Sequence, residues 1–498
     1  MITKADKKNA VWNSVTFILI SLIGFVSFSL TIKSFDSSTL GLFILLNSVL
    51  GLGTTFDFGF GMSTIKYIAE AKAMEDYDHI NSIIASFLVV FIIAGLLISV
   101  IMICYYYFFI RDTTMVSGVA KSEIDFIFLI LAVSNLFRYV SNYLRTIIEG
   151  YSEFILSSKL SIAVTVLNFV LILILYIYKL SISFLAIITL TVSLFAIGLY
   201  LYAVIFSLKN VRLKFSFFNF SIIKKYSVYG INIQLSFLVG NSIDTVIKYL
   251  TGSYLSLSFV TYYETAKKII DITNGIILSA NKAVFNILSE HNIKETLKQF
   301  INEKLYVFSK ASNYYNFLIY GIANPVLCYF ILYWFRSYEA MMIFMMFIIP
   351  YSLISIGASL YSVIMIRGKG KVLLVIQSVN FAMVFIFLYI SLNLFENYLG
   401  LLSYYIATIN SQFMIYYFLK KNYDFDVKKY FKEINFYDLV KLNVLLILQL
   451  TLVYFYPEKL NYILITFFFI YLVIFSGYLK YFAKELYKKT GKEYLFKI

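Results

Sequence analysis

The sequence predicts an all-α, polytopic membrane protein of about fourteen transmembrane helices, and three observations lead to this fold class. Hydrophobic residues make up 61% of the 498 residues, and charged residues only 14%. A soluble chain of this length cannot bury so much apolar surface, because single cores stop growing well below this size. The apolar residues also gather in long stretches, and each spanning helix needs about 20 such residues. The polar connectors between the stretches are too short to fold as separate domains.

The apolar stretches follow one another along the whole chain. The first is too long for the core of a signal peptide and lacks a small-x-small cleavage site, so we expect it to remain as a span. Prolines fall in the ninth and tenth stretches, where membrane helices tolerate kinks. A methionine cluster in the tenth stretch predicts a packing surface. The predicted spans are 11–32, 39–60, 82–109, 123–147, 155–178, 182–207, 226–249, 256–287, 305–334, 339–366, 371–393, 397–419, 437–456 and 459–480.

The distribution of lysine and arginine predicts the orientation of these spans. If the N-terminus is cytoplasmic, only seven of the 42 basic residues fall on the opposite side, and most of the others lie in cytoplasmic connectors. An even number of spans then places both termini in the cytoplasm. The formal net charge of +15 is therefore mostly positive-inside bias. Nucleic-acid binding would need a basic folded face, and the sequence offers none.

A weak internal repeat predicts two lobes. Residues 37–43 (SSTLGLF) resemble residues 253–259 (SYLSLSF), and six predicted spans separate the two stretches. An even number of intervening spans gives both halves the same orientation, which is one of the known plans of transporters. Each pair of spans that the repeat joins is followed by a polar connector, and the second connector should form an interfacial helix. The predicted domains are an N-terminal lobe at 1–210, a C-terminal lobe at 211–421, and a terminal helix pair with a basic tail at 422–498.

Span eight carries four charges on one helical face. Glu264, Lys267, Lys268 and Asp271 are spaced i, i+3, i+4 and i+7. Together they would cost roughly 10 kcal/mol if they faced lipid, so the face should line a wet cavity. Two alternatives remain open at this stage. The charges could neutralise each other as i,i+4 pairs within a packed bundle, or this stretch could lie at the membrane interface.

Span four carries a second polar stripe, with steps of three and four residues. Arg138 lies well inside the span and favours a role in a cavity. Arg145 lies nearer the cytoplasmic end, where a long side chain can snorkel to water. The members of the stripe are Asn135, Arg138, Asn142, Arg145 and Glu149.

Two further acidic residues are candidates for the cavity. Asp244 lies near the outer end of span seven, four residues before Lys248, where a solvated helix end is an equally good interpretation. Asp57 lies near the cytoplasmic end of span two within FDFGFG, where it could cap a loop instead of gating a path. The two cysteines, Cys104 and Cys328, are far apart in apolar segments, and the chain shows no disulfide or metal pattern.

The stretch LGLFILLNSVLGLGTTFDFGFGMSTIKYIAE (40–70) resembles the second span and following connector of polysaccharide-unit, or O-antigen, flippases. These Wzx-type proteins form a family of the multidrug/oligosaccharidyl-lipid/polysaccharide exporter superfamily. In the second half, Asp244 and the stretch YYETAKKIIDI (262–272) also resemble the family pattern, whereas Asn286 stands where the family often has a proline. The matching positions in the first half are Gly41, Asp57, Gly59, Lys66 and Tyr67.

The resemblance implies a function and a location. Such proteins move an oligosaccharide linked to undecaprenyl diphosphate from the cytoplasmic to the outer leaflet of the bacterial inner membrane. Two lobes rock around a central cationic cavity, for the assembly of surface polysaccharide such as lipopolysaccharide. The implied partners are this lipid-linked substrate, membrane lipid, a coupling ion (H⁺ or Na⁺) and other membrane proteins of polysaccharide assembly. It implies no cofactor and no enzymatic activity.

The chemistry of a diphosphate agrees with the embedded charges. A diphosphate headgroup needs fixed positive charge in a site of low dielectric constant, where charge-assisted hydrogen bonds are strong. We therefore expect Arg138, Lys267 and Lys268, helped by Arg145, to bind the substrate. Asp57, Asp244, Glu264 and Asp271 would neutralise these cations in the empty cavity or couple transport to an ion.

A cation-coupled exporter of drugs or metabolites from the same superfamily is the nearest alternative. Such exporters bind cationic substrates with acidic cavities, whereas the embedded charges here include three cations. A glycan polymerase or ligase would need a large outward loop, and the longest outward connector here is short. An ATP-driven pump is excluded within this chain, because it has no G-x-x-x-x-G-K-[ST] motif.

Overall fold

The computed structural model describes residues 4–55, 60–111, 120–227, 231–279, 288, 296–367 and 369–490. These residues form helices joined by short connectors, and they include no β-strand. The chain divides into two compact units, which are described separately. Unit 1 comprises Met1–Thr261 and Gly368–Tyr398, and unit 2 comprises Tyr262–Arg367 and Leu399–Ile498.

A helix covers most of the described part of each of the fourteen predicted spans, which agrees with the predicted fold class. The ninth span is divided between two α-helices that flank a π-helical turn, η4 (Phe317–Ile322). The helices are α1 (Lys4–Ser34), α2 (Ser37–Thr55), α4 (Tyr77–Tyr105), α5 (Lys121–Gly150), α6 (Phe154–Tyr178), α7 (Ile182–Phe206), α9 (Ile231–Tyr254), α10 (Leu257–Ser279), α13 (Tyr306–Asn316), α14 (Asn324–Phe335), α15 (Tyr338–Ile366), α16 (Gly370–Phe395), α17 (Ser403–Tyr423), α19 (Phe436–Phe455) and α20 (Leu460–Thr490).

Shorter helices occupy the connectors. One of them, α3, follows α2 at the place where the first polar connector was predicted. The α-helices are α3 (Phe60–Ala73), α8 (Phe220–Ser227), α12 (Leu297–Glu303) and α18 (Val427–Glu433), and the other helical turns are η1 (Tyr106–Ile110), η3 (Phe215–Phe217), η5 (Leu399–Leu402) and η6 (Pro457–Lys459).

Length and composition alone identify fewer spans than fourteen. Among the described residues, eight helices are long and apolar enough to cross a membrane, or nine if the bent pair around η4 is one span. The long helices α9, α10 and α17 are not among them. Polar side chains interrupt their apolar surface, as the four charges of α10 illustrate. Such side chains in a membrane helix mark cavities, partners or function.

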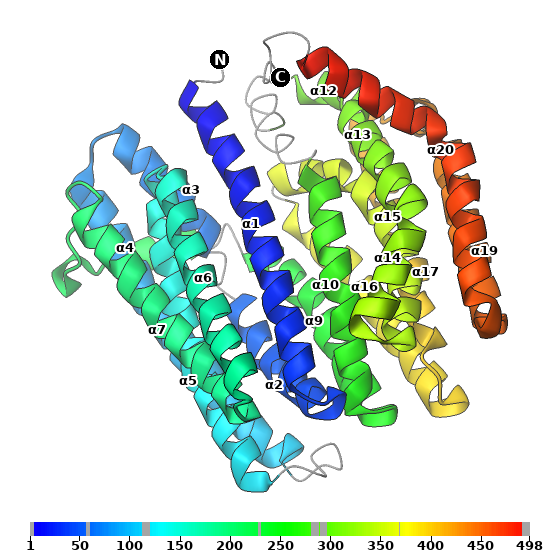
Figure 1. Ribbon diagram of the computed structural model, residues 1–498. Coiled ribbons are helices and arrows are strands. Elements are labelled where there is room, and N and C mark those ends of the chain that lie inside the picture. Colours follow the sequence, from blue (N-terminus) through cyan, green and yellow to red (C-terminus); the bar gives the residue numbers. More distant parts are fainter. Residues whose placement is uncertain are drawn as a thin grey trace. The chain divides into compact units, whose positions relative to one another are not determined.

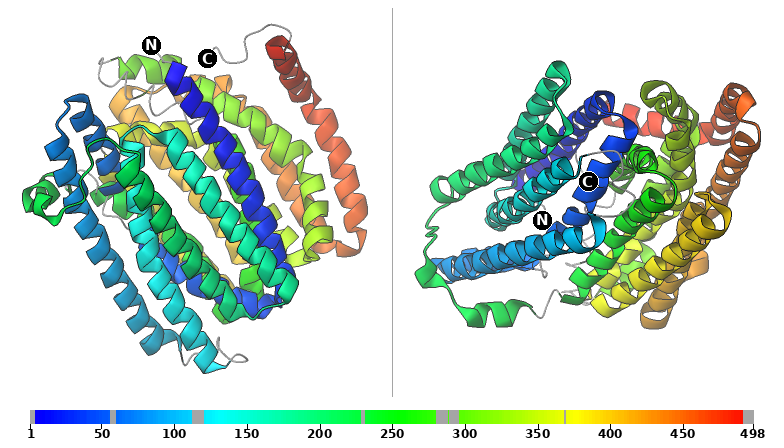
Figure 2. Two further views of the ribbon diagram at one scale, coloured as in Figure 1. Left: turned by 60° about the vertical axis from the view of Figure 1, so that its left-hand side comes forward. Right: turned by 90° about the horizontal axis from the view of Figure 1, so that it is seen from below.

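Unit 1 is built from long neighbouring helices. α5 packs along α7, α1 along α6 and α9 along α16, and α1 and α6 run side by side in Figures 1 and 2. α2 contacts both α5 and α9, so it connects the two helices that carry polar stripes. Many apolar side chains on the outer faces stay exposed, for example Val375, Ile386 and Leu394 on α16. In water such a surface would be unfavourable, and in lipid it is not.

The start of α2 requires a glycine. A Cβ atom at Gly41 would lie 1.8 Å from the backbone oxygen of Leu257, at the start of α10. Beside this contact, the Thr261 hydroxyl donates to the carbonyl oxygen of Ser37 over 2.7 Å. Gly41 and Leu257 occupy matching places in the internal repeat, so the two similar stretches lie against each other. Asp36 caps α2 by accepting from the Thr39 amide at 2.9 Å, and this hydrogen bond lowers the pKa of the Asp36 carboxyl.

Replacing Gly41 by alanine is expected to destabilise the protein by about 3 kcal/mol, the upper end of the usual overpacking range. The clash is with backbone, which cannot move aside as a flexible side chain can. Thermal unfolding of the purified variant in detergent would measure the effect. Gly198→Ala is the matched control, because a Cβ at Gly198 on α7 meets nothing within 4 Å. Equal unfolding temperatures for the two variants would contradict the close approach.

Unit 2 is organised around α15. This helix contacts α13, α14, α17 and α19. Within its most apolar stretch of 18 residues, 89% are buried inside the protein. A helix that is apolar on all sides is expected to lie in such a central position. The predicted methionine packing surface is confirmed, because its four members are buried: Met341, Met342, Met345 and Met346.

The two membrane prolines have different consequences. Pro325 stands at the start of α14, directly after η4, where the chain bends by 51°. Pro350 lies inside α15, which continues as one helix from Tyr338 to Ile366. The kink expected from proline is therefore present in the ninth span, whereas the tenth remains one helix.

The second polar connector differs from its prediction. The described part of it forms α12, and Leu297, Phe300 and Ile301 share one side as predicted. These side chains are buried within the protein, however, instead of lying in the membrane interface. Hydrogen bonds also hold α12 to the connector after α17. Asn302 donates to the Tyr423 carbonyl at 3.0 Å and accepts from the Asp426 amide at 3.2 Å. The predicted lobes at 1–210 and 211–421 and the terminal pair at 422–498 stay predictions.

Candidate substrate-binding site

In unit 1, polar side chains from three helices meet around the middle of α2. Adjacent residues of α2 contact different neighbours, because successive side chains on a helix point about 100° apart. Asn47 contacts α5 through Arg138, and Ser48 contacts α9 through Lys248. The polar stripe predicted for span four and the Asp244/Lys248 pair of span seven therefore both lie against α2.

Arg138 has no acidic partner among the described residues. Its guanidinium donates to the Asn47 side-chain oxygen over a long 3.5 Å, and this is its one side-chain hydrogen bond in the described part of the chain. The residue is half-buried. A cation in such a place is costly unless something compensates it. Arg138 is thus an incompletely satisfied cation inside a predicted span.

Asn135 lies one turn before Arg138 on α5. It is 1% exposed, and among the residues that the structure describes neither its side-chain oxygen nor its side-chain nitrogen has a hydrogen-bond partner. Buried amides are nearly always hydrogen-bonded, so an unpartnered one calls for an explanation such as a bound ligand. Together Arg138 and Asn135 offer donors that the protein itself does not use.

Lys248 is a buried cation that the sequence analysis did not identify as part of the candidate site. Its side chain is 6% exposed, and it pairs with Asp244 at 2.7 Å. It also donates to the Ser48 hydroxyl at 3.0 Å. The interpretation as a solvated helix end is wrong for Lys248, which α2 contacts, whereas the Asp244 side chain is 32% exposed. The i,i+4 spacing of Asp244 and Lys248 predicts that they can form an ion pair. Only the packing of α2 against α9 shows that Lys248 is buried.

In unit 2, the four charges of α10 form two ion pairs along the helix. Lys267 pairs with Asp271, and Lys268 pairs with Glu264 at 3.4 Å. Mutual neutralisation, one of the alternatives that the sequence left open, is therefore the arrangement found. The inner members are Glu264 and Lys267, with side chains 14% and 20% exposed, whereas Lys268 and Asp271 are about half exposed.

An aromatic side chain of α15 lies close to Lys267. Its ammonium group lies 5.7 Å from the centroid of the Tyr351 ring, a cation–π contact from α10 to α15. Tyr351 in turn stacks on Tyr404 of α17, with centroids 6.1 Å apart. The sequence did not identify these tyrosines, since no spacing rule relates residues on three separate helices.

Two further predicted site residues, Arg145 and Asp57, lie outside the groups of contacts described above. Arg145 pairs with Glu149 at 2.8 Å and is exposed, and Glu149 also accepts from Ser157 on α6. Arg145 is therefore a neutralised cation at the helix end, as a snorkelling side chain would be. Asp57 and Gly59 lie outside the described residues.

Solved structures of transporters share this fold. The chain is similar to the lipid II flippase MurJ in an inward closed conformation, with a TM-score of 0.63, 14% identity, and coverage of 95% of this chain and 99% of that one. A multidrug resistance MATE family transporter of the MOP superfamily, in an inward-facing conformation, gives a TM-score of 0.61 at 16% identity, covering 83% and 99%. A MOP superfamily transporter from Pyrococcus furiosus gives 0.61 at 15% identity, covering 84% and 96%. The chain thus shares its fold with transporters of the MOP superfamily.

The family follows from the sequence itself. The family model "Polysaccharide biosynthesis protein" matches residues 7–292, more than half of the chain. This protein therefore belongs to the polysaccharide biosynthesis protein family, and the resemblance noted in the sequence is confirmed. No curated protein matches the chain. The structural neighbours are named as transporters or as a flippase, not as enzymes.

Proposed function

We propose that this protein is a flippase for a lipid-linked oligosaccharide. It would move the headgroup, carried on undecaprenyl diphosphate, from the cytoplasmic to the outer leaflet of the bacterial inner membrane by alternating access. The surface polysaccharide so assembled would include O-antigen-like glycans of lipopolysaccharide. The family membership and the fold shared with a lipid II flippase support this assignment.

The observation that carries the proposal is the unused donor set on α5. Arg138 has no acidic partner in the described chain, and the buried amide of Asn135 has no hydrogen-bond partner there either. An anionic diphosphate would satisfy both, through charge-assisted hydrogen bonds that a neutral ligand cannot match. The polyprenyl tail needs no site in the protein, because it can remain in lipid.

The other predicted residues take supporting roles in this proposal. Lys267 and Lys268 would provide further positive charge to the substrate once their acidic partners release them. Glu264, Asp271 and Asp244 would hold the lysines while the site is empty, or would exchange a coupling ion such as H⁺ or Na⁺. Arg145 is the weakest member of the set, because Glu149 already neutralises it.

The charge balance separates this proposal from a multidrug exporter, whose fold is equally similar. An exporter of cationic compounds needs a carboxylate that its own protein leaves unneutralised. In the described spans, Asp244, Glu264 and Asp271 each pair with a lysine, whereas Arg138 pairs with no acid. The uncompensated charge is thus positive and favours an anionic substrate.

The test is a transport assay on the purified protein in lipid vesicles. We expect a fluorescent oligosaccharide on polyprenyl diphosphate to cross the bilayer and become accessible to an enzyme added outside. A cationic dye loaded into the same vesicles should not leave under a proton or sodium gradient. Gradient-driven efflux of the dye without movement of the glycolipid would contradict the proposal and support the exporter.

A further inference from the structure

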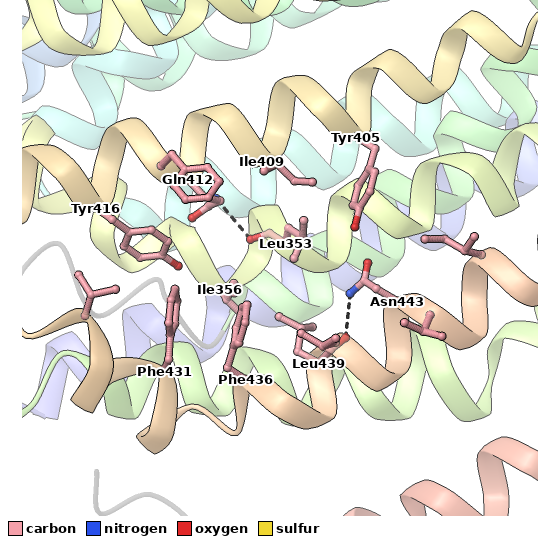
Figure 3. A pocket seen from close by; sticks show the side chains of 15 residues that line it. Leu353, Ile356, Tyr405, Ile409, Gln412, Tyr416, Phe431, Phe436, Leu439 and Asn443 are labelled. Carbon is pink, nitrogen blue, oxygen red and sulfur yellow. Dashed lines mark hydrogen bonds between the residues drawn. The ribbon is translucent and has the colours of Figure 1, made fainter.

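An apolar pocket in unit 2 is separate from the charged residues of α5, α9 and α10 described above. It has a volume of about 470 Å³ and lies between α15, α17, α18 and α19 (Figure 3). Pockets of this size accommodate small molecules or single hydrocarbon chains. Nothing in the proposed transport step uses it. The lining residues are Leu353, Ile356, Tyr405, Ile409, Gln412, Phe413, Tyr416, Val427, Phe431, Phe436, Leu439, Val440, Asn443, Val444 and Ile447.

The lining of the pocket is almost entirely hydrocarbon and aromatic. The Asn443 amide is already used within the protein, because it donates to Leu439 and accepts from Ser352. Gln412 donates to the Leu353 carbonyl, as the dashed line in Figure 3 marks. At the mouth, Phe413 and Val444 are exposed on the surface of the described helices. The pocket therefore opens sideways, toward the place where lipid chains would lie.

The length of the pocket fits one leaflet. Along α19 its lining runs from Phe436 to Ile447. At ~1.5 Å per residue this segment is about 16 Å long. Half of a hydrocarbon core about 30 Å thick is about 15 Å. A single acyl chain that enters along α19 would thus occupy the pocket from the membrane surface to the bilayer centre.

One end of the pocket is closed by the amphipathic helix α18. Val427 and Phe431 of this helix line the pocket, and Phe431 stacks on Phe436 with centroids 4.3 Å apart. The lysines of α18 and of the preceding end of α17 are exposed instead, and none has an ion-pair partner among the described residues. These five lysines, called the lysine rim, are Lys420, Lys421, Lys428, Lys429 and Lys432.

The nearby acidic residues form no ion pair with the lysine rim in the part of the chain that the structure describes. Asp424 pairs with Lys298, and Asp438 pairs with Lys441 at 3.3 Å. Asp426 caps α18 by accepting from the Lys429 amide at 3.0 Å. Residues 420–433 carry five lysines against three acidic residues. The rim thus has a net positive charge at the end of an apolar pocket, an arrangement typical of sites for anionic lipid headgroups.

We propose that this pocket binds one acyl chain of an anionic phospholipid whose phosphate lies on the lysine rim. The occupant is a lipid of the rim-side leaflet, which the lysine distribution predicts to be cytoplasmic. The site is distinct from the stripe of α5 and from the charges of α10. A bound lipid would hold α17, α18 and α19 together.

The test uses native mass spectrometry of the full-length protein in detergent with added dioleoyl phosphatidylglycerol or dioleoyl phosphatidylcholine. We expect the wild type to retain the phosphatidylglycerol preferentially. Val444→Trp, which blocks the mouth, should lose this adduct, and Leu448→Trp should keep it. Leu448 is the matched control because it is exposed on the same helix but does not line the pocket. Ile409→Trp fills the interior and serves as a second blocking variant.

The rim is tested by Lys428→Gln/Lys429→Gln/Lys432→Gln. Each lysine near an anionic lipid contributes roughly fivefold in affinity, so the preference for phosphatidylglycerol should fall by tenfold or more. Lys209→Gln/Lys214→Gln/Lys371→Gln removes the same charge from exposed positions in unit 1 and should have little effect. Unchanged adducts in both blocking variants, or equal losses in the two triple variants, would overturn the proposal. Retention of a polyprenyl phosphate in place of the phospholipid, or a protein dimer that Val444→Trp separates, would equally reject it.

Discussion

Replacing Arg138 by alanine is expected to slow glycolipid transport strongly while the protein still folds and reaches the membrane. No acidic side chain in the described chain depends on Arg138 for neutralisation, so its loss leaves no buried charge uncompensated. The substrate would lose its contact with a fixed cation. A hydrogen bond to a charged group contributes about 1.5–3 kcal/mol, which corresponds to a rate loss of roughly 10- to 100-fold.

Two further variants separate charge from geometry. Arg138→Lys should retain part of the transport activity. Lysine keeps the positive charge but lacks the planar guanidinium group, which can donate hydrogen bonds to two phosphate oxygens at once. Arg145→Ala should transport nearly normally, since Arg145 is already paired with Glu149 at the exposed helix end. Glycan export by a host that lacks its own flippase, at equal membrane levels of each variant, measures all three. Normal export by Arg138→Ala would remove this residue from the site.

The second large effect concerns the stability of unit 1. Asp244→Asn removes the counter-ion of Lys248, whose side chain is 6% exposed. Breaking a buried ion pair on one side typically costs 3–5 kcal/mol, and we expect about 3 kcal/mol here because Asp244 is one third exposed. The hydroxyl of Ser48 would remain as a partner of Lys248, but it carries no charge. Thermal or denaturant-induced unfolding of the purified variants in detergent would measure the loss of stability.

A double variant tests the cause of this loss. In Asp244→Asn/Lys248→Met neither member of the ion pair is left as a buried, unpaired charge. The double variant should therefore regain most of the stability that Asp244→Asn loses. The effects of the two substitutions on the free energy of unfolding should be strongly non-additive. Glu264→Gln on α10 is the comparison, because its partner Lys268 is nearly half exposed and the pair should contribute less than about 1 kcal/mol. Additive effects at Asp244 and Lys248 would show that the pair is not energetically coupled.

The helices of this protein could be predicted from its sequence almost completely. Long apolar stretches separated by charged connectors have few alternatives, because lipid requires every backbone polar group to be satisfied within the segment. The burial of the methionines of α15 and the bend at Pro325 also agree with the predictions. These features depend on local composition and spacing.

The candidate site could be predicted only in part. Spacing placed Asn135 and Arg138 on one face of α5 and paired the charges of α10, because both relations lie within a single helix. It could not show that α2 inserts Asn47 and Ser48 between α5 and α9. Nor could it show that the apolar side of α12 packs on the protein instead of on lipid, since both surroundings accept the same side chains.

The sequence by itself determined that this protein is a helical, multi-pass membrane protein of the polysaccharide biosynthesis family, with cations embedded on single helix faces. The tertiary structure decided which of those charges are neutralised. Lys248, Lys267 and Lys268 each find a carboxylate one turn away, while Arg138 finds only the amide of Asn47. The physical reason is that spacing along one helix identifies possible partners, whereas burial and the contacts made across helices depend on how distant segments pack.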